Sequence, residues 1–115
     1  MQVTAKLGNY RVSARKARLL ADMIRGRQVE EALAYLDLSP KKFAKPLAKL
    51  VRSAVANAED KNNRDKAGID VDNLFVHTIT VNEGSSMWRI RARAQGRAAW
   101  IQRRTSHVTV VLEER

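Results

Sequence analysis

The chain has 115 residues, of which 22 are Lys or Arg and 12 are Asp or Glu, so its formal net charge is +10 at neutral pH. This length fits one domain, and the absence of cysteine excludes disulfide scaffolds, thiolate zinc sites, iron–sulfur clusters and cysteine nucleophiles. No run of about 18 apolar residues is present, so no membrane-spanning helix and no membrane partner are expected. Residues 1–7 lack the apolar stretch of a secretory signal, and we therefore expect a cytoplasmic protein.

The positive charge is divided into three blocks. Residues 1–28, 41–66 and 85–112 carry net charges of +6, +5 and +6, and acidic intervals lie between them. A disordered basic tail would concentrate its charge at one end of the chain. The blocks are therefore expected on the folded surface of a single domain, residues 1–115, and so large an excess of charge indicates a polyanionic partner.

The first block is predicted to contain a helix with two distinct faces. Residues 3–12 precede it as a strand or a turn, because Gly8-Asn9 interrupts the β pattern. Ser13 is a typical N-cap for a helix over residues 14–25, and Gly26 is a typical stop. The apolar residues of this helix share one face and the basic residues another: Ala17, Leu20, Ala21 and Ile24 against Arg15, Arg18 and Arg25.

Two further helices are predicted between residues 29 and 60. Residues 29–36 are amphipathic, with acids in the first turn, where the helix dipole favours them. Ser39-Pro40 is a start signal for a longer helix that ends near Asp60, but Pro46 would then lie past its first turn. Either the helix kinks there or it begins near Lys45 after an irregular segment, and residues 61–68 are predicted to be a polar loop.

Strands are predicted over residues 74–81 and 107–112, which are rich in β-branched side chains. The predicted fold class is therefore α+β, with three helices packed on a small antiparallel sheet and a long protruding β-hairpin arm.

The arm spans about residues 83–107. Arg89, Arg91 and Arg93 alternate with small or apolar residues, which is the period of a strand and places the guanidinium groups on one face. Gln95-Gly96 supplies the turn, and the second limb returns through Arg97, Arg103 and Arg104. An isolated two-stranded ribbon is marginally stable in water, so the arm is expected to become fully ordered on a partner.

The arm's composition selects a nucleic acid as that partner. Its six arginines have no acid among them, and the guanidinium fork binds phosphate and stacks on bases. Trp88 and Trp100 are candidate stacking platforms. Packing at the base of the arm is the favoured interpretation for Trp100, whereas both interpretations stay open for Trp88.

Catalytic and metal-binding patterns are lacking in the sequence. His77 and His107 are interpreted as strand residues, and Asp70 and Asp72 as loop acids. No phosphate loop, HExxH motif or nucleophile elbow occurs, so neither an enzyme nor a cofactor nor a metal is expected. Two alternatives are kept open: an architectural DNA-binding protein and a cationic membrane-surface protein. The Ala-Gln-Gly tip and the lack of a dimer seam argue against the first.

Three segments resemble the bacterial L-twenty-two family of large-ribosomal-subunit proteins, and the likeness covers nearly the whole chain. They are residues 13–26 (SARKARLLADMIRG), 53–59 (SAVANAE) and 97–110, which contain Arg103-Arg104-Thr105-Ser106-His107. The resemblance implies a body on the subunit surface and an arm threaded through 23S rRNA. Other large-subunit proteins and the nascent peptide are further implied partners, and no DNA is expected.

The resemblance also implies roles for individual residues. The N-terminal segment would contact rRNA through Arg11, Arg15, Lys16 and Arg18, and the arm tip would line the nascent-peptide exit tunnel. The expected tunnel-facing residues are Met87, Trp88, Arg93, Ala94, Gln95, Gly96 and Arg97. With the basic faces of the body and the arm, the expected RNA-binding set is Arg11, Ser13, Arg15, Lys16, Arg18, Arg25, Lys45, Lys49, Arg52, Trp88, Arg89, Arg91, Arg93, Arg97, Arg103 and Arg104.

Overall fold

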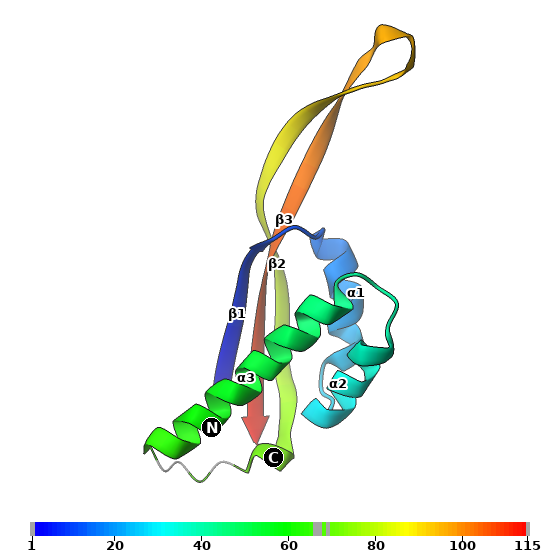
Figure 1. Cartoon of the computed structure of the whole chain (residues 1–115). Helices are drawn as coiled ribbons and strands as arrows, with labels where there is room; N and C mark the ends of the chain where they lie inside the picture. Colours follow the sequence, from blue (N-terminus) through cyan, green and yellow to red (C-terminus); the bar gives the residue numbers. More distant parts are fainter. Residues whose placement is uncertain (1, 66–67, 69, 115) are drawn as a thin grey trace.

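A three-stranded antiparallel sheet in the order β1–β3–β2 forms the centre of the molecule (Figure 1). The computed structural model describes residues 2–65, 68 and 70–114. Strand β1 spans Gln2–Tyr10, β2 spans Leu74–Ala92 and β3 spans Ala98–Glu114. Of the two alternatives left open for residues 3–12, the strand is observed, with an irregularity between Leu7 and Tyr10 where Asn9 has a φ of 51°.

Three helices cover one face of this sheet: α1 (Ala14–Ile24), α2 (Val29–Leu38) and α3 (Ala44–Asp65). Strand β3 alternates as a half-buried strand should, with Val108, Val110 and Leu112 at most 1% exposed while the residues between them are more exposed. These valines and leucines meet the apolar stripes of the helices in one core, and the other face of the sheet remains open.

The helix boundaries follow local signals in two cases. The Ser13 side chain accepts from Lys16 N, as predicted for an N-cap, and Gly26 follows α1 with a φ of +80°. Helix α3 begins at Ala44, which confirms the later of the two predicted starts. Pro46 is then the third helical residue, where the missing N–H has no intrahelical acceptor to lose.

The end of α3 was predicted wrongly. The helix continues through residues 61–65, which had been expected to lie in a loop, and Arg64 pairs with Asp60 one turn earlier. Such i,i+4 pairs, and cations in the last turn, stabilise a polar helix end that carries no apolar periodicity. Residues 66 and 67 of the expected loop lie outside the described residues.

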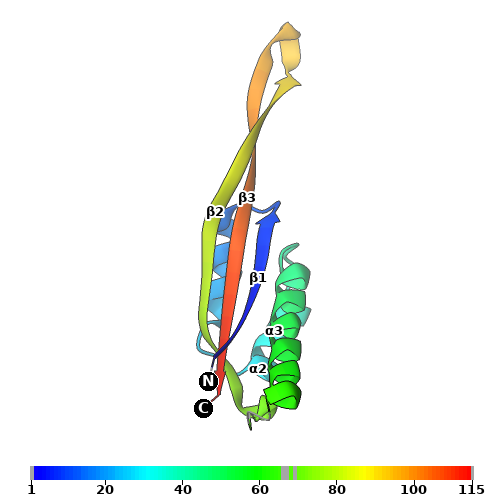
Figure 2. The ribbon, with the colours of Figure 1, turned by 90° about the vertical axis from the view of Figure 1, so that its left-hand side faces the viewer.

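Strands β2 and β3 continue past the body as a twisted two-stranded arm (Figure 2). The arm closes in a short 3₁₀ turn, Ala94–Gly96, in which Gln95 and Gly96 both have positive φ, at the predicted position. The arm gives the molecule extents of 65 × 27 × 16 Å and a radius of gyration of 17.4 Å, against about 13 Å for a compact domain of this length. The predicted fold class is confirmed.

In the part of the chain that the structure describes, no helix has both the length and the hydropathy needed to cross a membrane.

Candidate nucleic-acid interface

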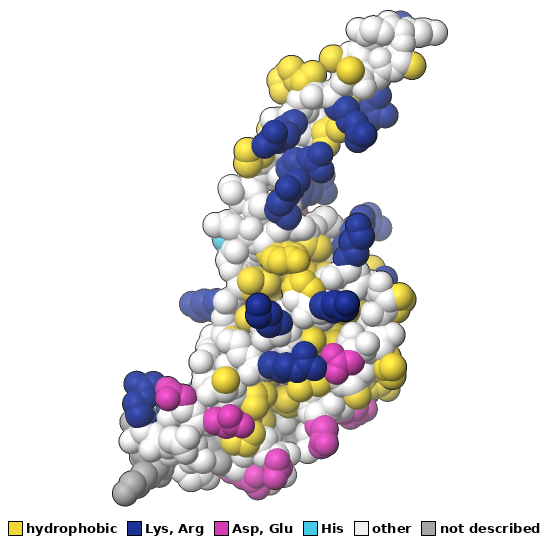
Figure 3. Space-filling model, viewed as in Figure 1, with side chains coloured by type: hydrophobic (Ala, Val, Ile, Leu, Met, Phe, Trp, Pro, Cys, Tyr) yellow, Lys and Arg dark blue, Asp and Glu magenta, His cyan; other side chains and the backbone are white. Residues whose placement is uncertain are grey.

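The pairing of β2 with β3 gives the arm one cationic face. Arg89 lies opposite Ile101, Arg91 opposite Ala99, and Met87 opposite Arg103. Paired residues of antiparallel strands share a face, so Arg89, Arg91 and Arg103 lie on the same face of the arm. The alternation in the sequence had predicted a shared face for Arg89 and Arg91. We call these three residues the arginine face. Their side chains are exposed and make no ion pair within the described residues, and basic side chains follow the arm in Figure 3.

Apolar side chains occupy the opposite face of the arm. Trp88 lies opposite Gln102, and Ile90 lies opposite Trp100. The two tryptophans and Ile90 are 60–66% exposed. The preferred interpretation of Trp100 was therefore wrong: its indole stands well out along the ribbon and does not pack at the base of the arm.

Arg93 and Arg97 flank the turn that closes the arm. Their backbones are joined by a hydrogen bond from Arg93 N to Arg97 O at 2.6 Å, and both side chains are exposed. Every residue from Ser85 to Ala98 is exposed, which includes the tip residues Ala94, Gln95 and Gly96. The tip thus offers charge and backbone polar groups to any partner that surrounds it.

The arm leaves the body at an irregularity of β2 between Glu83 and Ser86. A Cβ on Gly84 would lie 2.6 Å from the Thr105 Oγ1, so only glycine fits here without a shift of its neighbours. Ser106 is fully buried and donates from Oγ to Val12 O at 2.7 Å, and His107 Nδ1 accepts from Asn9 N. The sequence did not predict this junction, because it is formed by contacts between residues that are distant in the sequence and leaves no local sequence pattern.

A cavity of about 170 Å³ lies in the angle between α1 and the base of the arm. Arg15, Arg18 and Arg104 line it together with the single acid Glu83. Three guanidinium groups and one carboxylate make this concavity suitable for a phosphate. The structure thereby brings together residues that are nearly 90 positions apart in the sequence.

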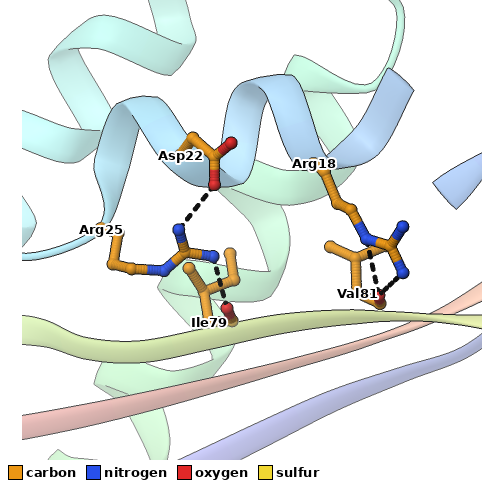
Figure 4. Close-up of polar contacts among 5 residues, drawn as sticks. All are labelled: Arg18, Asp22, Arg25, Ile79 and Val81. Atoms are coloured by element: carbon orange, nitrogen blue, oxygen red, sulfur yellow. Dashed lines mark hydrogen bonds and ion pairs between the residues drawn. The ribbon is translucent and has the colours of Figure 1, made fainter. Parts of the chain in front are cut away.

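Two arginines form hydrogen bonds to the edge of the sheet: Arg18 in α1 and Arg25, which is the C-cap of α1 (Figure 4). Arg18 donates from Nε and Nη2 to Val81 O, and Arg25 donates to Ile79 O and pairs with Asp22. Because β2 is an edge strand, its outward carbonyls have no strand partner, and these guanidinium groups satisfy them. That the two arginines also contact RNA stays a prediction.

The remaining expected residues of the body fall into two groups. Arg52 forms an ion pair with Asp37, and the Ser13 hydroxyl is used as the cap of α1. The others are exposed side chains without a polar side-chain contact among the described residues: Arg11, Lys16, Lys45 and Lys49.

Charge divides the molecule along its length. In Figure 3 the acidic side chains gather at the end of the body away from the arm, and basic side chains extend from the middle of the body along the arm. Asp70 accepts from Asp72 N and from the Asn73 side chain, and His77 faces Glu113 at 3.2 Å. No group of three potential metal ligands occurs among the described residues.

Comparisons with known proteins match this chain to one family. The model of the family described as "Ribosomal protein L22p/L17e" matches residues 5–113. The chain is 53% identical over 108 residues to "Large ribosomal subunit protein uL22" of Anaeromyxobacter sp. (strain K), covering 94% of this chain and 71% of that protein. It is 50% identical over 115 residues, the whole of both chains, to the protein of that name from Syntrophotalea carbinolica.

Proposed function

Because the chain belongs to the ribosomal protein L22p/L17e family, we propose that it is a structural constituent of the large ribosomal subunit that binds 23S rRNA and aids subunit assembly. The observation that carries the proposal is the arm, a ribbon with no core of its own and a continuous arginine face. Phosphates neutralised by such a face supply most of the affinity for nucleic acid, and the surrounding RNA supplies the packing that the ribbon lacks.

The body contributes a second contact region near the base of the arm. Arg15 and Arg104 line the cavity there, and Arg11 and Lys16 are exposed near the start of α1. Lys45 and Lys49 extend the basic surface onto α3. The acidic end of the body faces away from these groups, so the charge distribution orients the molecule with its arm toward the RNA.

The binding experiment compares two double variants of equal charge. Arg89→Gln/Arg91→Gln removes two charges from the arginine face, and Arg27→Gln/Arg64→Gln removes two from the body. Affinity for a structured 23S rRNA fragment is measured over a range of salt concentrations, with duplex DNA as competitor. The arm variant should bind more weakly, with a salt dependence shallower by about one counterion for each phosphate that is no longer neutralised. Equal behaviour of both variants, or preference for duplex DNA, would overturn the proposal.

We further propose that the arm tip lines the nascent-peptide exit tunnel, with the protein located in cytoplasmic ribosomes. All seven expected tunnel-facing residues are exposed. Arg93, Ala94, Gln95, Gly96 and Arg97 form or flank the turn that closes the arm, whereas Met87 and Trp88 lie near its base, opposite Arg103 and Gln102. Since the chain has no cysteine, Gln95→Cys gives a unique thiol for cross-linking in subunits that carry a stalled nascent peptide. Gln95→Cys should cross-link to that peptide, while Thr80→Cys on the open face of the body should not.

A further inference from the structure

The tryptophans of this chain lie on the same face of the arm. Trp88 and Trp100 belong to different strands, but the register places Trp88 opposite Gln102 and Ile90 opposite Trp100. The two indoles are therefore diagonal neighbours, and residues so placed have Cα atoms about 7–8 Å apart. We call Trp88, Ile90 and Trp100 the indole face.

The indole face has no partner in the part of the chain that the structure describes. Its three side chains are 60–66% exposed, and neither indole takes part in a hydrogen bond, ring contact or cation–π contact among the described residues. Tryptophans are among the largest apolar side chains, and a folded protein that exposes two on a thin ribbon gains nothing from them on its own. This arrangement indicates that the face is covered by a partner.

The opposite side of the same ribbon indicates which partner. The arginine face selects a polyanion, and a ribbon two strands wide brings any macromolecule that encloses it into contact with both of its sides. A polyanion that also presents flat apolar surfaces is a nucleic acid with unpaired bases. Positive charge combined with exposed aromatic rings is the pattern by which proteins bind single-stranded segments.

We propose that the indole face is a base-stacking site, which takes unpaired RNA bases on Trp88 and Trp100 while the arginine face holds phosphates. This inference rests on the proposed function, because it names the part of the RNA that the arm recognises. Ile90 fills the space beside the two indoles and keeps water from the stacked bases. The free indole N–H groups can donate to a base or to a ribose oxygen.

The chain provides its own probe for this site. Because it contains two tryptophans and both belong to the indole face, intrinsic tryptophan fluorescence reports on this face alone. Titration with the 23S rRNA fragment should quench the emission, and so should titration with single-stranded polyuridylate. Inorganic polyphosphate supplies the charge of RNA without bases, and it should bind while leaving most of the emission intact. Equal quenching by polyphosphate and RNA would overturn the inference.

Paired substitutions separate stacking from apolar contact. Trp88→Leu and Trp100→Leu keep an apolar side chain without a ring, whereas Trp88→Phe and Trp100→Phe keep a ring. Each leucine variant should lose about 5- to 100-fold in affinity for the rRNA fragment, while each phenylalanine variant should lose less. The salt dependence should not change, because every phosphate-binding side chain is kept. Circular dichroism checks that the body is folded, and the phenylalanine variants keep the test valid if a leucine variant is poorly ordered.

The outcomes distinguish this inference from the proposed function. If the unaltered protein fails to bind the rRNA fragment, the proposed function fails and the stacking site with it. If the unaltered protein binds and all four single variants bind within twofold of it, the arm contacts RNA without stacking, and only this inference is overturned. Leucine variants that bind RNA normally but fail to enter large subunits would show that a protein covers the indole face, which also overturns it.

Discussion

The Arg18 guanidinium satisfies an unpaired carbonyl at the edge of the sheet, because its Nε and Nη2 both donate to the Val81 carbonyl oxygen, at 3.2 and 2.9 Å. Val81 is the last buried apolar residue of β2 before the arm begins. This side chain thus joins α1 to the strand that carries the arm, close to the point where the arm leaves the body.

Replacement of Arg18 should therefore affect stability first. Arg18→Met keeps an unbranched chain of similar length but removes both donors, and a hydrogen bond that involves a charged group contributes about 1–3 kcal/mol. We expect the free energy of unfolding in urea to fall by about 1–2 kcal/mol. Arg15→Met is the matched control, because Arg15 lines the same cavity without an intramolecular polar side-chain contact among the described residues.

RNA binding should rank the two variants in the opposite order, with the larger loss of affinity in Arg15→Met. Arg15→Met should leave the unfolding free energy within about 0.5 kcal/mol of the unaltered protein and should weaken binding to the rRNA fragment. Equal destabilisation by both variants would contradict the role assigned to the Arg18–Val81 contact.

These arginines show where sequence reasoning ends. The helical spacing of Arg15, Arg18 and Arg25 correctly predicted that they lie on the polar side of α1. Spacing does not predict which other elements that side contacts. Two of the three meet carbonyls of β2, which is more than 50 residues away in the sequence. Local periodicity predicts faces, whereas the use of a face depends on tertiary contacts.

The arm shows the opposite case, in which local signals were sufficient. The alternation after Trp88 and the turn at Gln95-Gly96 fix the register of the ribbon, and both are visible in the sequence. Counting back from the turn places Trp100 opposite Ile90, midway along the arm. The misassignment of Trp100 came from the general tendency of tryptophan to be buried, although the period of two indicated an exposed ribbon.

The junction between body and arm should be sensitive to any side chain at residue 84. In Gly84→Ala the new Cβ would approach the Thr105 Oγ1 to 2.6 Å, so the Thr105 side chain or one of the two strands must shift. We expect a loss of about 1–3 kcal/mol in the free energy of unfolding. Gly8→Ala is the control, because its Cβ would meet the nearest atom at 3.7 Å and should cost under about 1 kcal/mol.

A double-mutant cycle tests the cause of that loss. Thr105→Ala removes the hydroxyl that the new Cβ would meet, so Gly84→Ala should cost less in the Thr105→Ala background than in the unaltered protein. Additive effects of the two substitutions would show that another contact, such as that with the His107 ring, opposes a side chain at position 84.

The buried Ser106 hydroxyl should stabilise the connection between β1 and α1. Its Oγ donates to Val12 O, and no part of the residue is exposed. Ser106→Ala leaves that carbonyl without its donor, so we expect a loss of about 1–3 kcal/mol by urea unfolding. Thr105→Val is the comparison, because the Thr105 hydroxyl also donates, to Ser85 O, but is only half-buried and should matter less. A larger effect of Thr105→Val would contradict the importance given to burial.

Removal of the arm should leave the body folded. The apolar core lies entirely in the body, and the pair Ser86–Arg104 allows residues 87–103 to be replaced by Asn-Gly, which favours a two-residue hairpin turn. The shortened protein should unfold cooperatively, with a free energy within about 1 kcal/mol of the full chain, and should lose most of its affinity for the rRNA fragment. Affinity that survives the deletion would assign RNA binding to the body.

Hydrogen exchange should divide the free protein into two parts. The hydrogen bonds of β3 at Val108–Leu112 lie between two strands and under helices, so their amides should exchange slowly. Amides of residues 87–103 lie in a ribbon exposed on both faces, and an isolated ribbon of two strands is marginally stable, so they should exchange close to the rate of an unfolded chain.

Binding should remove this difference. When RNA encloses the arm, its ordering entropy is offset by the contacts made, and amides of residues 87–103 should become protected in the complex and in assembled subunits. Polyphosphate is the control, because charge neutralisation without enclosing bases should protect the arm less. If the arm amides of the free protein exchange as slowly as those of Val108–Leu112, the ribbon is rigid before RNA arrives. The arm would then act as a preformed wedge, and its arginines would serve affinity without the folding step.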